Sequence, residues 1–380
     1  MTIWACALLM ASGAADLAQV SEANLRATVE KLASFHTRNT LSEGHREAAA
    51  WVAEKFREIP GVEVELMTYR AEGRRIPEPF DAVQVVATVK GTSDRTILLG
   101  AHLDSLNLQV DAKTGRAPGA NDDASGVAML LEVCRLVAGK PWSQTIKFAA
   151  FTGEEQGLLG STALAKRAKA EGWKLDAMLN SDMIGVSKNF NGQSEPNRVR
   201  IFSEDGEGHQ SRELARWLEF AIREAMGPDF GVKLVYRRDR FGRGGDHTPF
   251  VLEGFSAVRF CEVFEETQAQ HNAIDLVEHM DFAYLAKNAR ANLASVNALA
   301  TAADPPQNVR LVARQGYHTT VRWQAKEGVR YAVLWRDTAS PVWQGRQEVG
   351  AVATATIQNV NIDDHLFAVQ AIGGIPVVAR

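Results

Sequence analysis

The sequence predicts an α/β fold with a mixed, mostly parallel central sheet flanked by helices, followed by a small C-terminal β-sandwich. Three short runs are largely apolar with few charges, as expected for strands that are covered on both faces: 96–101, 145–151 and 177–182. Helical segments separate these runs, and such alternation is typical of parallel sheets. After about residue 302, short alternating strands divided by Gly, Asp and Asn turns replace the helical pattern, which indicates a sandwich.

The elements around these runs follow from the period of their apolar residues. Helical spacing in 21–34 and 44–59 predicts two amphipathic helices. Beyond Pro60, apolar residues alternate with others in 62–66 and 83–89, which predicts a pair of strands at the edge of the sheet. Further helices are predicted at 124–138, 158–170, 211–226 and 281–301.

Composition and charge exclude several classes of protein. At about 150 residues per domain, a chain of 380 residues predicts two or three domains. The 42 Lys and Arg stand against 46 Asp and Glu without a long run of like charge, which argues against nucleic acid as a partner. Only three cysteines occur, which excludes a disulfide scaffold and a Cys-rich zinc module. Any bound metal must therefore be held by carboxylates and imidazoles.

A short apolar run near the N-terminus, Ile3 to Ala15, ends in small residues. Its length suits the core of a signal peptide, residues 1–15, better than a membrane span, which needs about 20 apolar residues. The positive segment that normally precedes such a core is absent, and the alternative is a first helix that packs into the core. No other stretch is apolar enough to span a bilayer. We therefore expect no membrane span and a secreted or periplasmic protein.

Polar side chains that can bind metals follow the predicted strands where these strands end. They are His102, Asp104, Asp122, Asp123, Glu154, Glu155 and Asp182. Because the carboxyl ends of parallel strands meet at one edge of a sheet, one cleft would hold these groups.

The carboxylates of this cluster require cations, because clustered carboxylates in a partly dry site repel one another and take up protons. Asp122, Glu155 and Asp182 would act as ligands. Together with the free carboxylate of Glu154 they carry four negative charges, which two divalent cations would cancel. With imidazole nitrogen added, the ligand set favours zinc over magnesium or calcium, although cobalt or manganese could substitute.

Six motifs follow one another between about residues 35 and 300. They are G-A-H-L-D (100–104), P-G-A-N-D-D-A-S-G (118–126), T-G-E-E-Q-G-L-L-G-S (152–161), N-S-D-M-I-G (180–185), G-D-H-T-P-F (245–250) and Q-H-N-A-I-D (270–275). In this order they resemble the di-zinc aminopeptidases related to bacterial leucyl aminopeptidase. That family also includes glutamate carboxypeptidase-like and glutaminyl-cyclase-like enzymes.

The resemblance implies a ligand set for two zinc ions per chain. His102 and Asp182 would hold one ion. Glu155 and His271 would hold the other, and Asp122 would bridge the pair. A pair of zinc ions about 3.5–4 Å apart would acidify a bridging water and polarise the scissile carbonyl.

The resemblance also implies roles for two carboxylates that are not ligands. Glu154 would act as general base, taking the proton of the water and delivering it to the departing amine. Asp104 would accept a hydrogen bond from the imidazole of His102 and so fix its tautomer. Asp123 matches no ligand and would organise the loop and the start of the next helix.

The sequence departs from the family pattern beside the second zinc histidine. Gln270 stands where relatives often have a tyrosine that helps to hold the oxyanion, so Arg240, Arg243 or the amides of 242–245 could supply that stabilisation. We place His247 in the wall of the site, with direct coordination as the alternative. Four phenylalanines would line a hydrophobic pocket or belong to the core: Phe241, Phe250, Phe255 and Phe264.

The C-terminal segment resembles a fibronectin type III domain. The resemblance rests on Pro305–Pro306, on Trp323, on the strand 331–335 and on the strand 365–371, with His365 where that family usually has a tyrosine. The predicted division is therefore a signal peptide at 1–15, a di-zinc peptidase domain at 16–302 and a sandwich at 303–380.

These inferences lead to a zinc-dependent aminopeptidase that removes N-terminal residues from peptide substrates. A carboxypeptidase or a glutaminyl-cyclase-like enzyme of the same fold is the first alternative. Cyclases work with one zinc, so the complete ligand set favours hydrolysis. A non-catalytic binding protein on a peptidase scaffold is the second, and such proteins typically lack ligands or the base. The sequence leaves the natural substrate and the oligomeric state open.

Overall fold

The computed structural model describes residues 16–380, except for 112, 207–208, 241–242 and 313–315. The chain divides into two compact units, one that ends at Ala300 and one that spans Thr301–Arg380. The predicted signal peptide, residues 1–15, lies outside the described residues, so it remains a prediction. Among the helices that the structure describes, none has an apolar stretch long enough to cross a bilayer.

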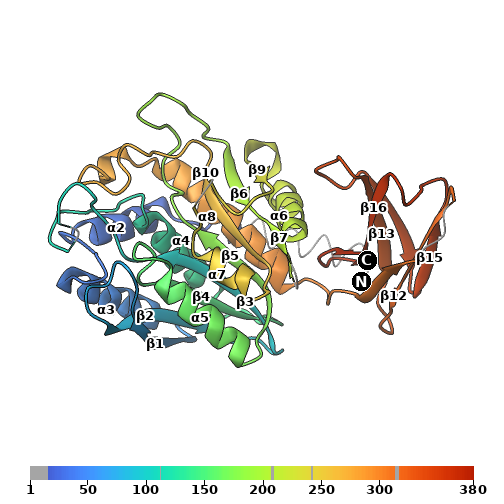
Figure 1. The fold of residues 1–380 in the computed structure, drawn as a ribbon, viewed down its shortest axis with the longest axis horizontal. Helices are drawn as coiled ribbons and strands as arrows, with labels where there is room; N and C mark the ends of the chain where they lie inside the picture. Colours follow the sequence, from blue (N-terminus) through green and yellow to red (C-terminus); the bar gives the residue numbers. More distant parts are fainter. Residues whose placement is uncertain (1–15, 112, 207–208, 241–242, 313–315) are drawn as a thin grey trace. The chain divides into compact units, whose positions relative to one another are not determined.

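The first unit is built on an eight-stranded sheet with the strand order β1-β2-β4-β3-β5-β10-β6-β9 (Figure 1). Its strands are β1 (Val62–Ala71), β2 (Phe80–Val89), β3 (Arg95–His102), β4 (Thr145–Phe151), β5 (Lys174–Ser181), β6 (Arg198–Phe202), β9 (Gly231–Val235) and β10 (Ala257–Glu262). The pairs β4-β3, β3-β5, β5-β10 and β6-β9 are parallel, and the others are antiparallel. The predicted mixed, mostly parallel sheet is confirmed.

Helices cover both faces of this sheet (Figure 1). They are α2 (Glu22–Ala33), α3 (Glu43–Arg57), α4 (Ala124–Val137), α5 (Leu159–Ala170), α6 (Ser211–Met226), α7 (His247–Leu252) and α8 (Phe282–Ala300). On one face, α5 and α7 pack on Leu98 and Phe151. On the other, Phe56 of α3 meets Phe148 of β4 with ring centroids 6.2 Å apart, and α4 packs on β3 and α8. Phe148 and Phe151 point to opposite faces because side chains alternate along a strand.

Most predicted elements lie close to the observed ones. The predicted strands 96–101, 145–151 and 177–182 match β3, β4 and β5, and the predicted helix 211–226 coincides with α6. The strands β6, β9 and β10 were not predicted. In β10, buried Arg259 and Glu262 interrupt the apolar run that marks a central strand.

The second unit consists of two antiparallel sheets, as predicted. One contains β11 (Gln307–Leu311), β12 (Thr319–Gln324) and β15 (Thr354–Ile357). The other contains β13 (Tyr331–Asp337), β14 (Gly345–Gly350), β16 (His365–Ala371) and β17 (Val377–Val378). Trp323 and Tyr331 lie in their common core, with ring centroids 5.5 Å apart. This arrangement is consistent with the resemblance to fibronectin type III domains.

Candidate metal centre

Five side chains that can bind metals meet at the carboxyl-terminal edge of the parallel strands. His102 is the last residue of β3 and Asp182 follows β5, whereas Asp122, Glu155 and His271 lie in loops. They form two groups that share one carboxylate: His102, Asp122 and Asp182, and then Asp122, Glu155 and His271. In each group the ligand atoms lie within 4.8 Å of one another. The structure therefore brings together all five predicted ligand positions.

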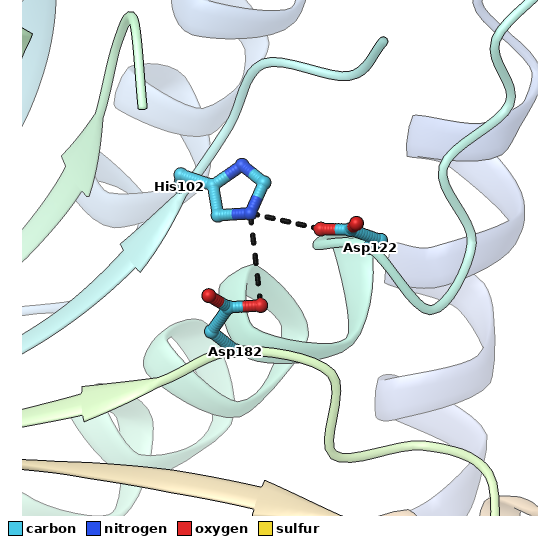
Figure 2. A group of neighbouring side chains, drawn as sticks. All are labelled: His102, Asp122 and Asp182. Atoms are coloured by element: carbon cyan, nitrogen blue, oxygen red, sulfur yellow. Dashed lines mark ion pairs between the residues drawn. The ribbon is translucent and has the colours of Figure 1, made fainter. Parts of the chain in front are cut away.

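In the first group, the His102 imidazole faces two carboxylates (Figure 2). Its Nε2 lies 2.9 Å from Asp122 Oδ1 and 3.8 Å from Asp182 Oδ1, and all three side chains are buried. Burial lowers the pKa of His102, but the contacts with Asp122 and Asp182 outweigh it and raise this pKa well above its usual value. The two carboxylates thus stabilise positive charge at this position.

In the second group, Nε2 of His271 lies 3.0 Å from Glu155 Oε1 and 3.3 Å from Asp122 Oδ2. Burial lowers the pKa of His271, but contacts with Asp122 and Glu155 outweigh it and raise the pKa to about 10. His271 adopts φ 54°, in the left-handed region that non-glycine residues rarely occupy. Such backbone strain is concentrated at functional sites. Asp122 offers one oxygen to each group, which places it as a bridge between them.

The residues present fit divalent metal ions. Nδ1 of His102 lies 2.9 Å from the main-chain oxygen of Asp104, so Nδ1 carries the hydrogen. In a neutral ring, Nε2 then directs its lone pair at carboxylate oxygens, and a proton or metal ion must lie between them. Glu155 Oε1 is buried and faces Nε2 of His271 at 3.0 Å, so these two atoms likewise need a proton or a metal ion between them. One imidazole and two carboxylates per group form a donor set that suits zinc.

Asp104 acts differently from its predicted role. Its carboxylate does not take the imidazole hydrogen bond, since Oδ1 lies 3.9 Å from Nδ1 of His102 and the main-chain oxygen takes it instead. The buried carboxylate accepts three main-chain amides, from Gly153 at 2.9 Å, Glu154 at 3.2 Å and Glu155 at 3.1 Å. Asp104 therefore fixes the loop that carries the predicted base and a ligand.

Glu154 lies at the edge of the metal centre, outside both ligand groups. Burial, reinforced by the negative charges of Glu155, Asp246 and Asp182 and opposed by His102, raises the pKa of Glu154 well above its usual value. A carboxylate with increased proton affinity beside a ligand cluster is suited to accept and release a proton.

Two further aspartates hold the loop of Asp122. Asp275 accepts the amides of Asn121 and Asp122, both at 2.9 Å. Asp123 caps α4 by accepting the amide of Gly126 at 2.9 Å, and its other oxygen accepts the amide of His102 at 3.2 Å. Asp123 thus organises the loop and the helix start, as expected, and also tethers the end of β3.

Sequence reasoning missed Arg259, which lies fully buried in β10. Its Nη2 lies 3.1 Å from Asp182 Oδ2, and its Nη1 donates to Asp239. This contact occupies one oxygen of Asp182 and leaves Oδ1 to face His102. The signal in the sequence is a lone arginine within an otherwise apolar stretch, Ala-Val-Arg-Phe-Cys, because a buried guanidinium requires buried acceptors, which here are the carboxylates of Asp182 and Asp239.

The residues that the sequence left ambiguous have clear positions. His247 is buried and its Nε2 lies 2.8 Å from the main-chain oxygen of Arg238, so it belongs to neither ligand group. Gln270 Nε2 lies 3.0 Å from Asp122 Oδ2. Phe250 is fully buried in the core beside α5, and the partly buried Phe255 packs on the same cluster, so both belong to the core. Phe264 is half-buried, and Phe241 lies outside the described residues.

Known proteins resemble this chain in sequence and in fold. The model of Peptidase family M28 matches residues 84–296. A probable zinc metalloprotease of Pyrenophora tritici-repentis is 34% identical over 412 residues, which cover 94% of this chain and 93% of that protein. The solved LapA aminopeptidase of Legionella pneumophila matches with a TM-score of 0.61 and 20% identity, over 75% of this chain and 74% of that chain.

A solved glutaminyl cyclase of Bacteroides thetaiotaomicron also shares the fold, with a TM-score of 0.58 and 19% identity over 73% of this chain and 98% of that chain. The fold alone therefore does not choose between aminopeptidase and cyclase. The family is decided by the family model, which matches more than half of the chain, and by the fungal relative, which is similar over nearly its whole length. The chain therefore belongs to peptidase family M28 and is a metallopeptidase.

Proposed function

We propose that the protein is an aminopeptidase that binds two zinc ions and removes N-terminal residues from peptides. The observation that carries this proposal is the position of Asp122. One of its oxygens lies 2.9 Å from the imidazole of His102 and the other 3.3 Å from that of His271. A carboxylate shared in this way by two ligand groups suits a pair of ions better than a single one.

The ligands divide between the two ions. His102 and Asp182 would hold one ion, Glu155 and His271 the other, and Asp122 both. Two zinc ions bound there would lower the pKa of a water molecule and polarise the carbonyl of the scissile bond. The fungal relative, named a probable zinc metalloprotease, supports zinc as the metal.

The protein's own groups would move the proton. Glu154 would accept it from the attacking water and give it to the amine of the departing peptide, a role that typically contributes about 10²–10⁴ in rate. The amides held by Asp104 fix the main chain on which Glu154 and Glu155 lie. Base and ligand would therefore extend from a main chain that is held in one conformation.

The carbonyl oxygen would be stabilised by groups other than a tyrosine. Gln270 contacts Asp122, and Arg243 Nη1 lies 3.5 Å from Gln270 Oε1. The guanidinium of Arg243 thus lies near the metal centre, where it could offer donors to developing negative charge.

A panel of four peptides assayed with and without a chelator tests the proposal. Leu-Ala-Ala-amide has a free amine, its acetylated form does not, acetyl-Ala-Ala-Leu has only a free carboxylate, and Gln-Ala-Ala-amide can cyclise. We expect release of leucine from the first peptide alone, abolished by the chelator and restored by zinc. Cleavage of the third peptide would indicate a carboxypeptidase, ring closure of the fourth a cyclase, and no reaction a binding protein.

A further inference from the structure

An open pocket of about 590 Å³ in the first unit is rich in arginine. We call it the arginine pocket, and its charged lining residues are Arg237, Arg238, Arg240, Arg243, Glu204 and Asp239. Four guanidinium groups against two carboxylates give this lining an excess of positive charge.

The pocket lies beside the metal centre. Leu158, which also lines it, is in the loop that carries Glu154 and Glu155. Arg243 Nη1 lies 3.5 Å from Gln270 Oε1, and Gln270 Nε2 lies 3.0 Å from Asp122 Oδ2. A single side chain, that of Gln270, therefore separates the guanidinium of Arg243 from the bridging carboxylate. A substrate whose scissile bond lies at the metal centre would have its neighbouring groups within reach of the pocket.

The carboxylates near the pocket already have partners. Arg238 pairs with Glu204 at 2.6 Å, and Arg240 pairs with Glu265 at 2.7 Å. Asp239 is fully buried against Arg259. These pairs fix the segment on which the arginines lie and leave no acidic group of the lining unpaired.

Arg237 and Arg243 are exposed and form no ion pair with any residue that the structure describes. Their charges are therefore available to a ligand. Guanidinium groups bind carboxylates through paired, charge-assisted hydrogen bonds, which are stronger than neutral ones.

From this arrangement we infer that the arginine pocket binds a carboxylate of the peptide substrate, so that the enzyme prefers peptides with a carboxylate close to the scissile bond. The carboxylate is either an acidic side chain or the C-terminal carboxylate of a short peptide. The inference rests on the proposed aminopeptidase function, and it adds the class of substrate.

Four dipeptides with the same N-terminal residue distinguish a side-chain carboxylate from a C-terminal carboxylate. Leu-Gln-amide carries no carboxylate, Leu-Glu-amide carries one in the side chain, Leu-Gln with a free C-terminus carries one at its end, and Leu-Lys-amide reverses the charge. For the zinc-loaded protein we expect kcat/KM about tenfold higher for at least one carboxylate peptide than for Leu-Gln-amide, as one charge-assisted hydrogen bond would give. Leu-Lys-amide should be the poorest substrate.

The variant Arg237→Gln/Arg243→Gln should reduce this preference to less than about twofold, with unchanged zinc content. The matched control is Arg223→Gln, which removes an exposed arginine of α6 outside the pocket and should keep the preference. Equal kcat/KM for Leu-Gln-amide and both carboxylate peptides in the wild-type protein would overturn the inference. A preference that survives in the double variant would do the same.

A binding measurement separates failure of this inference from failure of the proposed function. In Glu154→Gln, titration calorimetry with Leu-Glu-amide, Leu-Gln and Leu-Gln-amide reports affinity without turnover. A carboxylate peptide that binds about tenfold more tightly supports the pocket even if the wild-type protein hydrolyses none of the peptides. Equal affinities contradict the pocket even if leucine is released.

Discussion

The role of Asp104 leads to a prediction that separates the sequence expectation from the structure. If the carboxylate served to orient the His102 ring, Asp104→Asn could still accept that one hydrogen bond through its amide oxygen. In the structure the Asp104 carboxylate instead accepts hydrogen bonds from three main-chain amides, two at Oδ1 and one at Oδ2. Asparagine has only one acceptor oxygen, so at least one buried amide would face an NH₂ group and lose its partner.

The magnitude follows from these contacts. A buried donor left without an acceptor costs about 1–3 kcal/mol, and the remaining bonds weaken because the acceptor is no longer charged. We expect Asp104→Asn to lower the free energy of unfolding by about 2–4 kcal/mol. Glu155 belongs to the same loop, so zinc affinity should fall about 10–100-fold, as for other groups that position ligands.

Urea unfolding in the presence of a chelator measures the first effect without the contribution of bound metal. Competition with a chromophoric chelator measures the second. The matched control is Asp281→Asn, whose carboxylate accepts the Tyr284 amide at the start of α8. It should lose less than about 1 kcal/mol, because asparagine caps a helix nearly as well as aspartate, and it should keep its zinc affinity. The reasoning fails if Asp104→Asn unfolds at the wild-type urea concentration and binds zinc as tightly as the wild type.

Three further predictions concern other groups. Glu154→Gln should keep close to two zinc ions per chain by metal analysis while kcat falls about 10²–10⁴-fold, and undiminished hydrolysis would remove Glu154 as the base. His271→Ala should weaken one metal site, whereas His247→Ala should keep both, and the opposite result would show the ligand assignment to be wrong. Burial lowers the pKa of His45 to about 4, so the folded state keeps this ring neutral. Below pH 6.5 the unfolded chain takes up a proton at this ring and the folded protein does not. The free energy of unfolding therefore falls by about 1.4 kcal/mol per pH unit between pH 6.5 and pH 4. Urea unfolding in chelator at pH 7 and pH 5 should therefore show about 2 kcal/mol less acid destabilisation in His45→Gln than in the wild type.

The centre of the fold could be predicted because its strands are buried on both faces. The sequence segments that form β3, β4 and β5 are largely apolar. Polar residues follow each of them, and the change from apolar to polar indicates where the strand ends at the edge of the sheet. The strands β6 and β10 could not be recognised in the same way. Arg198 and Arg200 alternate with apolar residues in β6, and buried charges interrupt β10. Arg200 and Arg259 pair with Glu265 and Asp182, which are distant in sequence, and periodicity does not reveal such partners.

The positions of the candidate ligands could be predicted for the same reason, whereas the contacts of their neighbours could not. His102 and Asp182 lie where parallel strands end, so their proximity follows from topology. Which oxygen of Asp104 meets His102 depends on main-chain geometry that residue type does not encode. The contact of Arg259 with Asp182 requires knowing that β10 lies beside β5, a pairing between strands far apart along the chain.

The structure also changes the charge argument for metal binding. From the sequence, the four carboxylates of Asp122, Glu154, Glu155 and Asp182 were expected to be balanced by two divalent cations. Arg259 adds a positive charge, but its partner Asp239 cancels it. Asp246, which that count left out, is fully buried, and burial together with the charges of Asp104 and Asp182 raises its pKa to about 7. The carboxylates therefore exceed what two cations cancel. In the metal-free protein, protons on His102, His271 and Asp246, whose pKa values are all raised, neutralise part of this negative charge. Because divalent ions favour the ionised carboxylates, metal binding must displace these protons, so zinc affinity should rise with pH.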